Sequence, residues 1–131
     1  MSISTDSTFL PAAFDPADWS QVQPLIDELR QRDLSSVDAL HDWLADASAL
    51  ADAMGEAGSR ANIDHARDTS DTEAEQRYLH FIERIQPQLS EAFFHLQRKF
   101  LDCPYRDELT GERFDVLRRE WEADVALFRP D

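Results

Sequence analysis

The sequence has very little cysteine, glycine and lysine, and each shortage excludes a class of protein. A single cysteine, Cys103, permits no internal disulfide and no zinc site built on several thiolates, and it agrees with a reducing compartment. Gly55 and Gly58 have the spacing G-x-x-G, but they lack the following lysine and the preceding strand of a phosphate-binding loop. The first residues show neither early basic side chains nor a sustained apolar run. We therefore expect no secretory signal, no membrane anchor and a cytoplasmic location.

Basic residues are in the minority, with 13 against 27 acidic residues and a formal net charge of −14. This charge would repel phosphate backbones and anionic membrane surfaces, so we expect no nucleic-acid partner and no membrane partner. Lys99 is the single lysine, and aspartate outnumbers glutamate, which is a bias typical of halophilic or GC-rich sources. A halophilic source is a hypothesis that the salt dependence of stability can test.

What the chain does contain is the composition of a folded protein, with 42% hydrophobic, 31% charged and 10% aromatic residues. Its 131 residues suffice for one domain with one core. We divide the chain into an N-terminal arm, residues 1–14, and a single helical bundle domain, residues 15–131. The apolar side chains of the arm, Phe9, Leu10 and Phe14, are expected to dock on the bundle.

The first helix is predicted to begin at Asp15 and to end near Arg32. Asp15 can cap free amide groups, and Pro16 is tolerated at the first helical position. Pro24 interrupts the pattern, so we expect a kink or a restart there. The apolar residues at helical spacing are Trp19, Val22, Leu25, Ile26 and Leu29.

A second, long helix is predicted from Ser36 to Arg67, with a start signal of Ser35 and Ser36 followed by Asp38, which is a serine cap with a carboxylate in the first turn. Gly55 and Gly58 weaken a helix, but we favour continuation because Ala57, Ala61 and Ile63 keep small and apolar residues available for packing. One continuous stripe, widened by Trp43 and Leu50, should be buried: Val37, Leu40, Leu44, Ala47, Ala51 and Met54.

The polar cluster Asp68–Thr72 predicts the turn of a helical hairpin. Thr72 and Glu75 fit a capping box for the third helix. Pro87 should kink this helix, which should stop at Cys103, before a proline. Its buried stripe is expected to comprise Tyr78, Phe81, Ile82, Ile85, Leu89, Phe93, Leu96 and Phe100.

Thr110 is predicted to cap a last helix that ends at Pro130. Its buried face would be formed by Phe114, Leu117, Trp121, Val125 and Phe128. The chain shows no strand-like alternation and no internal repeat. The fold class predicted is all-α: an elongated antiparallel bundle of about four helices around a long central helical hairpin.

The four histidines, His41, His65, His80 and His95, do not have the spacing of a metal site. None belongs to an HExxH motif, and the Glu-x-x-His pair of di-iron bundles is absent. His80 and His95 are separated by about 22 Å of helix, too far to share one ion. We interpret all four as surface or interface residues, and the missing ligand spacings argue against an independent metalloenzyme.

Asp64, His65, Asp68 and Ser70 could suggest nucleophilic catalysis, but no strained nucleophile turn accompanies them. Capping and solvation explain these residues more simply. Cys103 has no evident base and is interpreted as a partly buried structural thiol. We therefore predict no catalytic, cofactor-binding or metal-binding residue in this chain. Phe94, beside rather than in line with the third stripe, could mark a docking face.

The stretch 60–87 carries a family resemblance. It contains R-x-x-I (Arg60 and Ile63), then DT-x-D (from Asp68), then YLHFIERIQP (78–87), and an aromatic-rich helix follows through Lys99. This pattern resembles the N-terminal helical region of oligoendopeptidase F-type zinc peptidases, which are relatives of the thimet oligopeptidases. The resemblance covers roughly residues 9–129. Its motifs are helix-packing patterns rather than catalytic ones.

The resemblance implies a helical, two-lobed enzyme that encloses a deep substrate channel and cleaves short peptides. Its zinc ion would be held by HExxH and a downstream glutamate, none of which lies in this chain. Zinc is therefore implied for the full-length relative only, and no cofactor is expected here. The partner implied is the catalytic lobe of the same enzyme, and the chain alone should be inactive.

A second hypothesis is a free-standing helical module for protein interaction or oligomerisation. Its partner would be another helical protein or a second copy of the chain. Such a module would act through an exposed apolar face. The coding sequence beyond residue 131 would discriminate between the two hypotheses.

Overall fold

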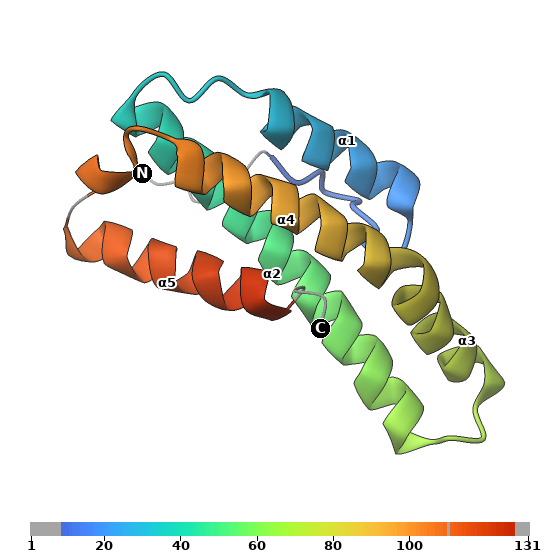
Figure 1. The fold of residues 1–131 in the computed structure, drawn as a ribbon. Coiled ribbons are helices and arrows are strands. Elements are labelled where there is room, and N and C mark those ends of the chain that lie inside the picture. Colours follow the sequence, from blue (N-terminus) through green and yellow to red (C-terminus); the bar gives the residue numbers. More distant parts are fainter. Residues whose placement is uncertain (1–8, 110, 128–131) are drawn as a thin grey trace.

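A computed structural model describes residues 9–109 and 111–127 (Figure 1). These residues form helices and connecting loops without any strand. The helical stretch from Thr72 to Asp102 is continuous and counts as one rod, so the described chain makes four helical rods. They confirm the all-α bundle with its long central hairpin. The elements in order are α1 (Trp19–Gln31), α2 (Val37–Arg67), α3 (Thr72–His80), the π-helical turn η1 (Phe81–Ile85), α4 (Gln86–Asp102), the 3-10 turn η2 (Arg106–Glu108) and α5 (Glu112–Leu127).

Consecutive rods run antiparallel, but the outer helices each pack beside a rod that runs in their own direction (Figure 1). α1 starts beside Gln88 and ends beside Lys99, so it is parallel to α4. α5 packs on α2, with Phe114 near its start against His41 near the start of α2. α1 and α5 thus support two different rods of the hairpin.

The predicted start of the first helix at Asp15 is wrong. Asp18 is the N-cap, and its carboxylate accepts a hydrogen bond of 3.0 Å from the amide of Ser20. The Asp15 carboxylate instead accepts from the amide of Ala17 at 2.9 Å and closes a turn that holds Pro16 outside the helix. The helix then continues through Pro24 without a restart and ends at Gln31, close to the predicted end.

The long second helix is confirmed. The Ser36 hydroxyl accepts from the amide of Ala39 at 3.0 Å, and the helix passes both glycines to end at Arg67. Gly58 allows close approach of the third rod, because a Cβ there would lie 2.7 Å from Cε1 of Phe81. The expectation that Ile63 packs is wrong, since 52% of its surface is exposed.

The predicted capping box at Thr72 is also wrong. Asp71 is the N-cap of α3, and its carboxylate accepts from the amides of Glu73 at 3.0 Å and Ala74 at 3.2 Å. Thr72 is the first helical residue. An aspartate accepts in the same position with a full negative charge, which the start of a helix favours over a hydroxyl.

The irregularity expected at Pro87 takes the form of the π-helical turn η1 just before it. The amide of Gln86 donates to the carbonyl of Phe81, five residues back. Proline crowds the carbonyl four residues before it and donates no hydrogen bond, and a wider turn relieves that crowding. The turn shifts the helix phase, so Ile82 is 37% exposed. Tyr78 is only half-buried, whereas Phe81, Ile85, Leu89, Phe93, Leu96 and Phe100 are buried as predicted. The helix ends at Asp102 before Cys103, as predicted.

The core is centred on aromatic rings from three rods. Trp43 of α2 stacks on Phe100 with ring centroids 6.5 Å apart, and Trp121 of α5 lies 5.7 Å from both Trp43 and Phe93. Each buried indole has a hydrogen-bond acceptor: Trp43 Nε1 donates to the Leu29 carbonyl at 2.8 Å, and Trp121 Nε1 donates to a side-chain amide oxygen at 2.6 Å. The apolar stripes predicted from periodicity meet here.

The arm docks on the bundle as expected, because Phe9, Leu10 and Phe14 pack against the core. The Arg32 guanidinium lies 5.6 Å from the centre of the Phe9 ring. Thr110, Phe128 and Pro130 lie outside the described residues, so the predicted cap and end of the last helix stay predictions. None of the helices in residues 9–109 and 111–127 is both long and apolar enough to cross a membrane.

Candidate functional site

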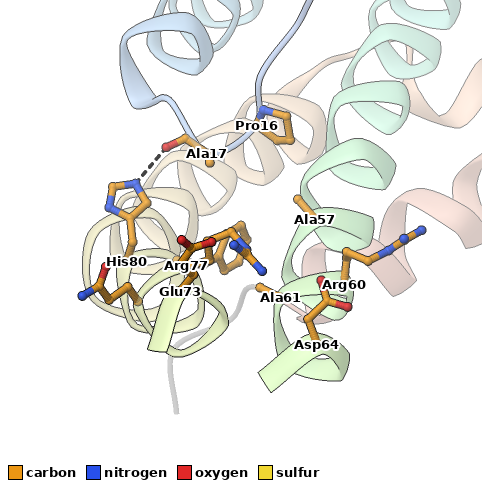
Figure 2. Close-up of a pocket in the computed structure, with 11 residues that line it drawn as sticks. Pro16, Ala17, Ala57, Arg60, Ala61, Asp64, Glu73, Arg77 and His80 are labelled. Atoms are coloured by element: carbon orange, nitrogen blue, oxygen red, sulfur yellow. Dashed lines mark hydrogen bonds between the residues drawn. The ribbon is translucent and has the colours of Figure 1, made fainter. Parts of the chain in front are cut away.

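The tip of the central hairpin carries the candidate site, because there the two rods have no third helix over them (Figure 1). No residue of α2 beyond Met54 is buried, and α3 buries only Ala74. A groove of about 590 Å³ lies between α2, α3 and the turn that precedes α1 (Figure 2). A groove of this size could take a side chain or short segment of another protein.

The floor of the groove is small and apolar. It consists of Ala57 and Ala61 of α2 and Phe81 of η1, and Pro16 and Ala17 of the turn before α1 line its side. His80 fixes that turn: its Nε2 donates to the carbonyl oxygen of Ala17 at 2.8 Å, because a carbonyl can only accept (Figure 2). The turn before α1 therefore forms one wall of the groove.

The other walls carry charges of both signs. Arg60 and Asp64 come from α2, and Glu73 and Arg77 come from α3. None of the four takes part in an ion pair or side-chain hydrogen bond within the described part of the chain. Figure 2 shows Arg77 reaching from α3 toward α2, whereas Arg60 points away from α3. These charges remain available to a partner that covers the apolar floor.

Stacking between His65 and Tyr78 ties α2 to α3 on the tip, with ring centroids 4.8 Å apart and 17° between the planes. In the turn that follows α2, the Asp68 carboxylate accepts hydrogen bonds from both the amide and the hydroxyl of Ser70, at 3.0 and 2.6 Å. These bonds lower the pKa of Asp68. Asp68 and Ser70 thus form a turn, and the residue that caps α3 is Asp71.

The histidines lie apart from one another in the structure. The ring of His41 meets Phe114, the ring of His95 meets Phe94, and His80 bonds Ala17. Nowhere among residues 9–109 and 111–127 do three or more His, Cys, Asp or Glu side chains converge as metal ligands would. These residues do not fit the zinc site of a peptidase. The prediction that the chain holds no catalytic or metal residue stays a prediction.

Residues 9–128 match the family described as the peptidase M3 N-terminal domain. The chain belongs to this family. The match confirms the resemblance to the N-terminal region of M3 peptidases, the family of the thimet oligopeptidases. No curated protein and no solved structure matches the chain. The groove at the hairpin tip is therefore a surface feature of an M3 N-terminal domain.

Sequence reasoning placed the groove residues in the family motif but did not find the groove of this M3 N-terminal domain. A local signal existed: Arg60 and Asp64, and likewise Glu73 and Arg77, are four residues apart on helices that also carry small residues. Oppositely charged residues at this spacing usually form an ion pair with each other along their own helix. Only the structure shows that these charges stay unpaired beside a floor without a covering helix, and that Arg77 reaches across it while Arg60 points away from α3.

Proposed function

We propose that this chain is the N-terminal helical lobe of an oligoendopeptidase F-like zinc metallopeptidase, a cytoplasmic hydrolase that cleaves short peptides. The observation that carries the proposal is the match of residues 9–128 to an M3 N-terminal domain. The pattern Tyr78–Pro87 favours the oligoendopeptidase F type within that family. The chain itself has no HExxH motif, so the zinc ion and the catalytic residues belong to another part of the enzyme.

Within this enzyme the lobe contributes channel wall and docking surface. The groove at the hairpin tip supports the docking role, since its apolar floor and unpaired charges have the organisation of an interface, with an apolar centre and a polar rim. The partner is the catalytic lobe, and its side of the contact would present an apolar side chain with charges for Arg77 and Asp64.

The isolated chain should neither bind zinc tightly nor cleave peptides. Metal analysis after dialysis against zinc, together with an assay on an internally quenched short peptide, checks both expectations. An intact oligoendopeptidase assayed alongside is the positive control. Stoichiometric zinc in the isolated chain, or activity that survives repurification, would contradict the proposal.

A free-standing interaction module is the second candidate, and exposed apolar side chains on α4 favour it. Phe94 and Leu101 are 57% and 42% exposed. If these residues form a self-association face, sedimentation velocity should show a dimer that Phe94→Ser dissociates and that Glu56→Gln, at an exposed position of α2, preserves. A reading frame that continues past residue 131 to an HExxH motif would favour the lobe instead.

A further inference from the structure

The carboxyl ends of α1 and α4 lie side by side, since Lys99 of α4 bonds carbonyl oxygens at the end of α1. A cleft of about 690 Å³ opens there, and most of the side chains that line it are polar. This α1–α4 cleft shares no lining residue with the groove at the hairpin tip. It is therefore a second candidate site, and the docking role of the groove does not account for it.

One end of the α1–α4 cleft is basic. The residues of α1 that line its seam with α4 fall at steps of four, three and four, and they are Trp19, Gln23, Ile26 and Arg30. Arg30 therefore lies on the face of α1 that meets α4, and both Arg30 and His95 line the seam and the cleft. Neither side chain takes part in an ion pair or hydrogen bond within residues 9–109 and 111–127. Their N–H groups remain available to an anionic ligand.

Lys99 is held in a fixed position on the wall of the cleft. Its Nζ donates to the carbonyl oxygens of Arg30 and Arg32, both at 2.6 Å. An ammonium group has three protons, so one N–H is left for a ligand in the cleft that Lys99 lines. The Arg32 guanidinium cannot serve in the same way, because it is engaged by Glu28 at 2.7 Å and by Asp46 at 2.9 Å.

The opposite end of the cleft is acidic. Asp33 follows the end of α1, Asp102 is the last residue of α4, and both line the cleft without an ion-pair partner among the described residues. His95 and Asp102 are seven residues apart on α4, so about 10 Å of helix separates the basic end from the acidic end. Three residues of extended chain span about the same distance. The cleft thus offers charges of opposite sign at the spacing of the two ends of a tripeptide.

We propose that the α1–α4 cleft binds a short zwitterionic peptide of about three residues. The peptide carboxylate lies at Arg30 and His95, where the guanidinium supplies charge-assisted hydrogen bonds. The peptide ammonium lies at Asp33 and Asp102, and Lys99 donates its remaining proton to a carbonyl oxygen between the two ends. A phosphate dianion fits less well, because the two aspartates repel it. The proposal does not rest on the proposed function, since a free-standing module would carry the same cleft.

A magnetic resonance titration of the nitrogen-labelled chain with trialanine, at constant ionic strength, tests the proposal. Amide shifts in residues 30–34 and 95–103 should move saturably, whereas those of the hairpin tip should not. N-acetyl trialanine and trialanine amide each lack one terminal charge, so each should bind about fivefold or more weakly. Absence of saturable shifts at millimolar trialanine would overturn the proposal. Inorganic phosphate that displaces trialanine at equal concentration would overturn it as well, because that result describes a general anion site.

Two exposed positions at opposite ends of the cleft allow variants that keep the core intact. Arg30→Gln should lose most of the preference for trialanine over its amide, because the partner of the carboxylate is gone. Asp102→Asn should lose most of the preference over the N-acetyl form. Arg119→Gln removes an exposed charge from α5, outside the cleft, and should bind all three peptides as the wild type does. Unchanged preferences in both cleft variants would overturn the proposal.

Discussion

At the scale of single residues, the one lysine of the chain closes the carboxyl end of α1. Lys99 Nζ donates to the carbonyl oxygens of Arg30 and Arg32, both at 2.6 Å. Burial lowers the pKa of Lys99, and the nearby charge of Arg32 acts in the same direction. A cation at this place satisfies carbonyls that the helix leaves unbonded and complements the helix dipole.

Replacing Lys99 by methionine should therefore destabilise the fold by about 1–3 kcal/mol, because two charge-assisted hydrogen bonds are lost while the apolar stem is kept. Urea denaturation monitored by circular dichroism measures the change. Arg98→Met, at the exposed neighbouring position, is the matched control and should stay within about 0.5 kcal/mol of the wild type. Equal stability of the two variants would show that Lys99 is not a cap.

At the scale of elements, one close contact joins the two rods of the central hairpin where η1 passes α2. Gly58 of α2 faces the Phe81 ring of η1, and a Cβ there would lie 2.7 Å from Cε1. The Phe81 ring also separates the groove from a second cavity of about 340 Å³ on the Tyr78 side. The position of Phe81 thus fixes the width of the candidate docking surface.

Gly58→Ala should cost about 1–3 kcal/mol through overpacking, reduced by the roughly 1 kcal/mol that alanine gains over glycine in a helix. Thermal unfolding measures the net loss. Phe81→Leu removes the ring that a Cβ at position 58 would meet. In the Phe81→Leu background, Gly58→Ala should therefore lower the stability by less than it does in the wild type. Additive losses in the double variant would mean that the two side chains do not meet.

The same scale shows how far sequence reasoning reaches. Periodicity located α2 and the buried rings Trp43, Phe93 and Trp121, because a long apolar stripe has only one way to be buried. Cap positions failed where capping residues stand close together: the choice of Asp18 over Asp15 depends on Gln21, whose Oε1 accepts from the amide of Asp15 at 2.9 Å. Local rules do not contain such side-chain contacts.

The candidate site was even harder to predict from the sequence than the cap positions. A groove exists where a covering helix is missing, and a pattern within one helix carries no information about its neighbours. The family, by contrast, could be recognised from the pattern of residues 60–87, and the match of residues 9–128 confirms it.

At the scale of the whole molecule, the net charge of −14 on 131 residues opposes the compact state. Few of the acidic side chains are neutralised: the ion pairs of the described residues engage Glu28 and Asp46 with Arg32, and otherwise only exposed neighbours along the chain. Much of the repulsion between the remaining carboxylates acts through solvent, where dissolved salt screens it within about 10 Å at 0.1 M.

The melting temperature should therefore rise as sodium chloride is increased from low to molar concentration at pH 8. Differential scanning calorimetry measures the slope. A variant in which the exposed Glu56, Glu83 and Glu91 are replaced by their amides has less repulsion to screen, so its melting temperature should start higher and rise less. This pair of curves separates screening from the general effect of salt on apolar burial, which the variant shares. A wild-type melting temperature that stays flat or falls with salt would show that the acidic surface does not limit stability, and it would remove the argument for a halophilic source.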